Sequence, residues 1–109
     1  MIKVSALYPN STDARFDMEY YTQKHMPLVL DRCGGDVALG GIDRALPGGA
    51  FGLEPPYCAI GHLLFESPEI MERSFGPHIR EILADVPNFT NVQPVVQISE
   101  VMSEPGRRR

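Results

Sequence analysis

The stretch that decides the fold is Tyr20 to Leu28, with the sequence Y-Y-T-Q-K-H-M-P-L. Met18, Tyr21 and His25 are spaced three and four residues apart, so they fall on one face of a predicted helix. Pro27 must redirect or restart that helix, because its ring does not fit an undisturbed helix interior. A buried histidine needs a hydrogen-bond partner and titrates near physiological pH, so His25 is a candidate proton-transfer group.

Strands and helices alternate on both sides of this segment. Period-two or apolar patterns predict strands at 2–8, 37–46, 57–65 and 92–101, and helical periodicity predicts helices at 13–33 and 68–86. The resulting order is strand, helix, strand, strand, helix, strand. This order predicts an α+β, ferredoxin-like βαββαβ fold, in which two helices cover one face of a four-stranded antiparallel sheet.

Local signals set the helix ends. Thr12 or Asp13 is expected to cap the first helix, and a glycine after Cys33 to end it. Ser67 followed by Pro68 is a strong start signal for the second helix. Gly76-Pro77 should break that second helix in two, so both helices of the fold are expected to be broken.

Length and composition indicate one ordinary globular domain, expected at 1–102, followed by a polar tail at 103–109. No apolar run approaches the roughly 20 residues of a membrane span, and the first residues do not resemble a secretory signal. Cys33 and Cys58 are isolated thiols, which favours a reducing, cytoplasmic location. The net charge is −4, and three of the ten Lys and Arg residues are Arg107–Arg109, so the rest of the chain is more acidic still, which argues against nucleic-acid binding.

The second face of the predicted sheet carries apolar residues that two helices cannot cover. Leu7, Ile60, Leu64 and Val95 would form an exposed apolar patch in a monomer. A second copy of the chain packed face to face would bury this patch and form an eight-stranded barrel. The sequence therefore predicts a homodimer that pairs through its sheet faces.

Five blocks of the chain are distinctive when taken together: L-Y-P at 7–9, F-D-x-x-Y-Y-x-x-x-H-M-P-L at 16–28, F-G-P-H at 75–78, D-V-P-N-F-T at 85–90 and P-V-V-Q-I-S-E-V at 94–101. With these blocks the chain resembles the EthD family, within the dimeric α/β-barrel superfamily. The resemblance covers about residues 1–102 and implies the fold, the dimer and a pocket. The family takes its name from a protein required for ether degradation, and its members have no agreed common reaction.

Candidate site residues follow from the residues and from that resemblance. His25 and His78 are the candidate acid–base groups, with Tyr21 one helical turn from His25 to orient it. The alternatives are structural: His25 can satisfy a backbone carbonyl, and His78 can be a first-turn polar residue. The candidate ligand-binding residues, placed at strand ends or on sheet faces, are Tyr8, Tyr57, His62 and Phe65. For His62 the alternative is a solvated or interface position.

Three classes of function compete. The first is a small cofactor-independent enzyme that acts on a cyclic or aromatic carbonyl metabolite by histidine-mediated proton transfer or oxygenation. The second is a non-catalytic binding or stress-related dimer that sequesters a small apolar or aromatic ligand. The third is haem binding through one histidine. The scattered histidines and cysteines lack metal-ligand spacing, and no glycine-rich phosphate loop suggests a nucleotide cofactor.

Overall fold

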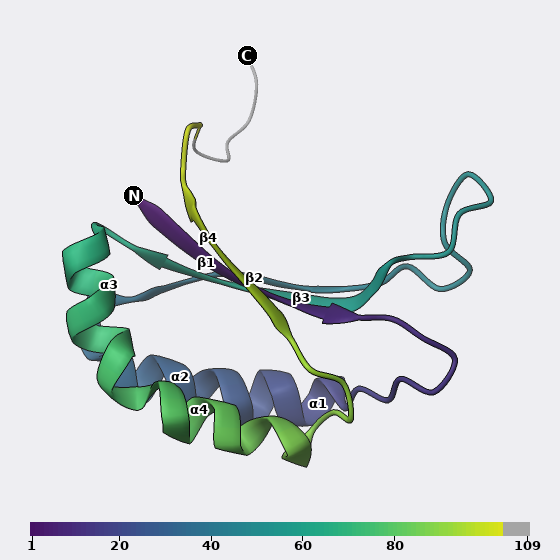
Figure 1. Cartoon of the computed structure of the whole chain (residues 1–109), viewed down its shortest axis with the longest axis horizontal. Coiled ribbons are helices and arrows are strands. Elements are labelled where there is room, and N and C mark those ends of the chain that lie inside the picture. The colour runs from purple at the N-terminus through teal and green to yellow at the C-terminus, as the bar shows by residue number, and fades with distance from the viewer. Residues whose placement is uncertain (104–109) are drawn as a thin grey trace.

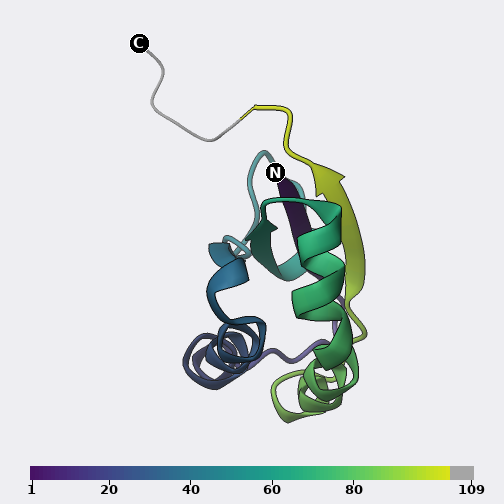
Figure 2. The same ribbon diagram turned by 90° about the vertical axis from the view of Figure 1, so that its left-hand side faces the viewer.

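The computed structural model describes residues 1–103 and has the predicted element order. The strands are β1 (Ile2–Pro9), β2 (Ala38–Arg44), β3 (Tyr57–Phe65) and β4 (Val95–Glu100). They form an antiparallel sheet in the order β2-β3-β1-β4, with all helices on one side of it (Figures 1 and 2). The predicted α+β, ferredoxin-like fold is confirmed. The expected tail at 103–109 lies, apart from its first residue, outside the described residues.

The first helical segment is continuous but irregular, so the break expected at Pro27 does not occur. It consists of α1 (Met18–Tyr20), a π-helical stretch (Tyr21–His25) and α2 (Met26–Cys33). The N–H of Met26 bonds to the carbonyl of Tyr21, a wide i→i−5 turn placed directly before Pro27. Proline has no N–H to donate and its ring crowds the preceding turn, so a wider turn accommodates it without ending the helix.

The ends of this segment correct one prediction and confirm another. The N-cap is Asp17, whose carboxylate accepts from the N–H of Tyr20, and neither Thr12 nor Asp13 caps the helix. The residues before Asp17 form an irregular connection instead. The hydroxyl of Thr90 donates a hydrogen bond to the carbonyl oxygen of Arg15 in this connection. Gly34 ends α2 with a positive φ of 67°, the conformation for which glycine was expected there.

The second helical segment is broken where the sequence indicates. It comprises α3 (Pro68–Phe75), a 3-10 turn (Gly76–His78), α4 (Ile79–Asp85) and a second 3-10 turn (Val86–Asn88). Ser67 caps α3 by accepting from the N–H of Ile70 at 3.2 Å. The break bends the segment, so that α4 lies beside α2 while α3 turns up toward the sheet (Figures 1 and 2).

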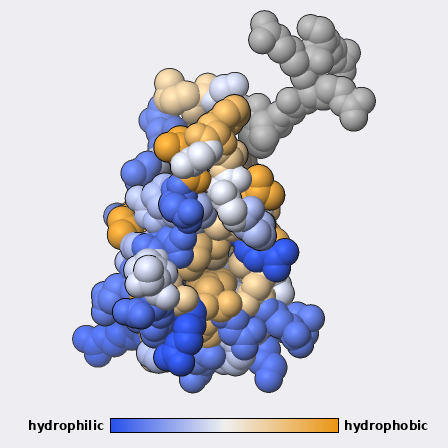
Figure 3. Space-filling model, turned by 90° about the vertical axis from the view of Figure 1, so that its right-hand side faces the viewer, coloured by the Kyte–Doolittle hydropathy of each residue, from blue (hydrophilic) through white to orange (hydrophobic). Residues whose placement is uncertain are grey.

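The core fills the space between the sheet and the two helical segments. Its residues come from two strands, from the inner faces of both helical segments and, for Phe89, from the residue after the last 3-10 turn. They are Val4, Tyr8, Tyr21, Met26, Val29, Cys33, Ala59, Leu63, Phe65, Met71, Ile82, Val86 and Phe89. The apolar layer reaches the surface on the side shown in Figure 3, where hydrophobic residues gather in the middle and hydrophilic ones frame them. The connection between β2 and β3 projects away from this core (Figure 1).

The outer face of the sheet is the one without helices. Leu7, Ile60 and Leu64 are half-buried there and Val95 is 51 % exposed. Within the part of the chain that the structure describes, no helix is both long and apolar enough to cross a bilayer. Cys33 is buried in α2, Cys58 is half-buried in β3, and both are free thiols.

Candidate active site

An apolar cavity of about 370 Å³ lies between the helix-facing side of the sheet and the two helical segments. Its walls come from all of these elements: Val4, Ala6, Tyr8, Tyr21, His25, Met26, Val29, Gly61, Leu63, Met71, Glu72, Phe75, Gly76, Ile79, Ile82, Leu83, Val86, Pro94, Val96 and Ile98. This volume and this apolar character are those of a small-molecule site. The cavity is therefore the first place to look for function.

His25 is held in the cavity wall by a buried hydrogen bond. Its side chain is 4 % exposed, and its Nδ1 lies 2.9 Å from Oδ2 of Asp85 at the end of α4. Asp85 also accepts from the Tyr20 hydroxyl at 2.7 Å and from the Asn88 amide at 2.9 Å. Three donors thus converge on one carboxylate. The network holds the His25 ring with Nδ1 toward this carboxylate, so the two ring nitrogens have different surroundings.

The charge states of the pair follow from its surroundings. Burial lowers the pKa of His25, and the hydrogen bond and charge of Asp85 offset this only in part. Burial alone would raise the pKa of Asp85, but the bonds from Asn88, Tyr20 and His25 together hold it below its usual value. Asp85 is therefore an ionised acceptor, and neutral His25 must carry its proton on Nδ1. Nε2 is then left with a lone pair.

An aromatic cluster fixes the plane of the imidazole. The ring of His25 stacks on Tyr21 at 5.4 Å between centroids and packs against Phe89 at 4.5 Å. Tyr21 and Phe89 also contact each other, and Tyr8 and Phe16 pack against both of them. Contact with two rings of this cluster leaves the imidazole little freedom to rotate away from Asp85. A fixed ring is what a proton-transfer group requires.

Two tyrosine hydroxyls lie at the floor of the cavity. Burial raises the pKa of Tyr21 to about 12 and that of Tyr8 still higher, and the two hydroxyls interact with each other. Both remain protonated at neutral pH and can act as hydrogen-bond donors. The ring of Tyr21 lies against Gly61 of β3, where an added Cβ would come within 1.9 Å of the hydroxyl oxygen. Gly61 is therefore the residue that makes room for this donor.

The cavity includes some of the expected site residues and not others. His25, Tyr21 and Tyr8 line it. Phe65 is fully buried in the core beside it, and Tyr57 is half-buried at the start of β3. Among residues 1–103, neither of these two is part of the cavity lining.

The other two histidines lie elsewhere. His78 is half-buried in the turn between α3 and α4 and outside the lining formed by the described residues. His62 lies on the outer face of the sheet, where its ring bonds to Ser5 at 2.8 Å and Asp43 at 3.2 Å. His78 was the expected partner of His25. In the structure the partner of His25 is Asp85.

Asp85, Gly61 and Glu72 are the site residues that the sequence analysis missed. Asp85 had a signal, because it follows Ile82 by three residues and so puts an acid on the apolar stripe of its helix. Gly61 and Glu72 have no comparable local signal, since their importance depends on which side chains pack opposite them.

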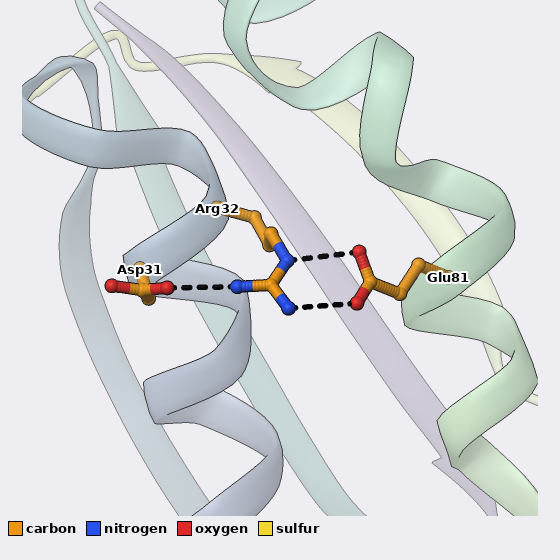
Figure 4. Close-up of polar contacts among 3 residues, drawn as sticks. All are labelled: Asp31, Arg32 and Glu81. Carbon is orange, nitrogen blue, oxygen red and sulfur yellow. Dashed lines mark hydrogen bonds and ion pairs between the residues drawn. The ribbon is translucent and has the colours of Figure 1, made fainter.

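The two helical walls of the cavity are also tied together at the surface. Arg32 of α2 forms a two-pronged ion pair with Glu81 of α4, with both N–O distances at 2.9 Å, and also contacts Asp31 at 2.8 Å (Figure 4). Paired donors of this geometry fix orientation as well as distance. Within residues 1–103, no group of three or more His, Cys, Asp or Glu side chains is arranged to hold a metal ion.

The fold and site define a ferredoxin-like α+β domain with a histidine–aspartate pair beside an apolar cavity. The EthD domain matches residues 9–93, and the chain belongs to the EthD family. A crystal structure of an EthD-like protein from Ralstonia eutropha JMP134 is 39 % identical, with a TM-score of 0.87 over 98 % of this chain and 96 % of that one.

A second solved structure, an ethyl tert-butyl ether degradation (EthD) family protein from Bacillus halodurans C-125, shares the fold at 19 % identity. Its TM-score is 0.60, and the likeness covers 94 % of this chain and 99 % of that one. No curated protein matches the chain.

Proposed function

We propose that this protein is a small cofactor-independent enzyme that moves a proton on a cyclic or aromatic carbonyl compound bound in the cavity. The observation that carries the proposal is the buried His25–Asp85 pair, because it holds a neutral imidazole with Nε2 free to accept a proton. Oxygenation of the same class of compound would begin with the same proton abstraction. The homodimer through the outer sheet face and a cytoplasmic location remain parts of this proposal.

The proton-transfer step can be written with the residues of the cavity. Nε2 of His25 takes a proton from the carbon next to the carbonyl group, and the C–H electron pair becomes the double bond of an enolate. The carbonyl oxygen gains the negative charge and accepts a hydrogen bond from Tyr21, whose hydroxyl stays protonated. Asp85 stabilises the imidazolium that forms, and return of the proton to another carbon or to the same one completes the cycle.

The second candidate is a non-catalytic binding protein for a small apolar ligand, favoured by the largely apolar cavity walls. Haem binding is the less favoured alternative. Its propionates usually need cationic partners, and the cavity walls formed by residues 1–103 contain no lysine or arginine.

Deuterium exchange separates an enzyme from a binder. We would incubate 2-tetralone, an enolisable bicyclic ketone, in D2O with the protein and follow loss of its α-proton signals by NMR. The proposal predicts exchange above the buffer rate that disappears in His25→Gln. If 2-tetralone binds but its α-protons exchange no faster with wild-type protein than in buffer, the binding function is the better account.

A further inference from the structure

We propose that the cavity selects uncharged one- or two-ring oxygen compounds and rejects the corresponding carboxylates, and that Glu72 at the cavity rim strengthens this selection. The inference rests on the proposed function in that it assigns a substrate class to the same cavity. It also goes beyond that function, because charge selection would operate on a ligand whether or not a reaction follows.

The cavity walls offer an anion no compensating charge. Among the lining residues within 1–103, only His25 could carry a positive charge, and burial lowers its pKa so that it is neutral. The remaining walls are almost all aliphatic or aromatic. Moving an unpaired carboxylate from water into such surroundings costs several kcal/mol, so an acid should bind more weakly than a neutral compound of the same shape.

Glu72 adds repulsion at the rim. It is an exposed residue of α3, and it is the one carboxylate among the lining residues of the described chain. An approaching anion would pass this carboxylate on a protein whose net charge is already −4. Charges within about 8 Å of each other are incompletely screened at physiological salt, so Glu72 acts on anything that enters beside it.

Size and polar groups define the rest of the ligand. A cavity of about 370 Å³ lies near the lower end of the volumes typical of small-molecule pockets, which suits one or two fused rings. The protonated hydroxyls of Tyr8 and Tyr21 interact with each other, which leaves one hydroxyl hydrogen in need of an acceptor, and a ketone or phenol oxygen supplies it without a charge. The combination points to neutral ketones and phenols rather than aromatic acids.

A matched pair of ligands tests the inference on the whole protein. 2-Acetylnaphthalene and 2-naphthoate have the same shape and number of non-hydrogen atoms but differ in charge. With 13C-methyl-labelled methionine, Met26 and Met71 report on the cavity they line, whereas Met1, Met18 and Met102 lie outside its lining and serve as internal controls. We expect the ketone to shift the two cavity methyl signals saturably, and naphthoate to bind at least about tenfold more weakly.

A charge reversal at the rim supplies the second arm. Glu72→Lys should strengthen naphthoate binding relative to ketone binding by about tenfold. Glu66→Lys makes the same change in net charge at an exposed position outside the lining, and should leave both affinities as in wild type. Equal binding of naphthoate and ketone by wild-type protein, no saturable response to the ketone, or equal gains in the two lysine variants would each overturn the inference.

The exchange assay keeps this inference separate from the proposed reaction. Selective binding of 2-acetylnaphthalene, without α-proton exchange in 2-tetralone, would leave charge selection standing and refute the proton-transfer function. Exchange that depends on His25, combined with equal binding of the two ligands, would do the reverse.

Discussion

A histidine bonded to an aspartate lies on each side of the sheet, and the two pairs differ in their burial and surroundings. On the helix-facing side, His25 is 4 % exposed and Asp85 is 14 % exposed, beside an apolar cavity. On the outer face, His62 is 20 % exposed and its partner Asp43 is 64 % exposed. The comparison shows that burial and a bounded cavity, more than the residue pairing, identify the candidate active site.

The two aspartates bond to different nitrogens of the two rings. Asp85 accepts from Nδ1 of His25, which leaves Nε2 unprotonated. For His62 the Asp43 carboxylate accepts from Nε2, and the Ser5 hydroxyl is bonded to Nδ1. Both ring nitrogens of His62 are thus engaged, whereas His25 keeps one nitrogen for a ligand.

Removing each histidine in turn should give the largest contrast. His25→Ala should lower the rate of α-proton exchange by about 10²- to 10⁴-fold, the usual contribution of a general base. His62→Ala should leave that rate close to wild type, because His62 lies on the other face of the sheet. Exchange rates measured by NMR on folded variants check this. Comparable losses in both variants would mean that the cavity is not where the chemistry occurs.

Replacing the aspartates should give the next largest contrast. Asp85→Asn should reduce exchange by on the order of tenfold to a hundredfold, since the amide no longer fixes the tautomer of His25 or stabilises its charged form. The carboxylate raises the pKa of His25, so the pH–rate profile should also move to lower pH in this variant. Asp43→Asn is the matched control and should change neither quantity. A loss of rate with an unmoved profile would assign Asp85 a purely structural role.

A methyl group on the cavity floor should disturb the protein itself. In Gly61→Ala the new Cβ would meet the Tyr21 hydroxyl at 1.9 Å and the Met26 methyl at 3.2 Å. Both are buried, so we expect a loss of about 1–3 kcal/mol in the free energy of unfolding, measured with urea. At Gly35 an added Cβ meets nothing within 4 Å, and Gly35→Ala should change stability by less than about 0.5 kcal/mol. Equal stabilities of the two variants would mean that Tyr21 is not packed on Gly61.

The smallest effect is on the pH dependence of stability. Because the pKa of His25 is lowered on folding, the unfolded chain binds this proton more tightly, and stability should fall as pH drops below about 6.5. The lowered pKa of Asp85 adds a further loss below about pH 4. His25→Gln should remove the first loss but not the second, with pH 8 as the common reference. An unchanged slope between pH 6.5 and 5 in that variant would contradict a neutral, buried His25.

The sequence predicted the fold well because its signals are local. Ser67-Pro68, Gly76-Pro77 and the alternating strand at 57–65 each determine nearby backbone, and all appear in the structure. The helix cap at Asp17 was missed because Thr12 and Asp13 are equally good capping residues and only tertiary contacts decide between them. The wide turn before Pro27 was anticipated only as a disturbance of the helix.

The site was less predictable because it depends on pairs distant in the chain. His25 and Asp85 are separated by 60 positions, and no local pattern links them. The sequence pointed to His78 as the partner because it shares the residue type, but packing of α4 beside α2 brings Asp85 there instead. The chemistry of a residue could thus be proposed from sequence, whereas its partner required the fold.

The tautomer of His25 tests the central claim most directly. Long-range 1H–15N correlation spectra of the wild-type protein at pH 7 distinguish protonated from unprotonated ring nitrogens, and His25→Gln assigns the signals. We predict a neutral His25 ring with a proton on Nδ1 and an unprotonated Nε2, together with a proton on Nε2 of His62. A protonated Nε2 on His25, as the other tautomer or as imidazolium, would contradict its role as the base.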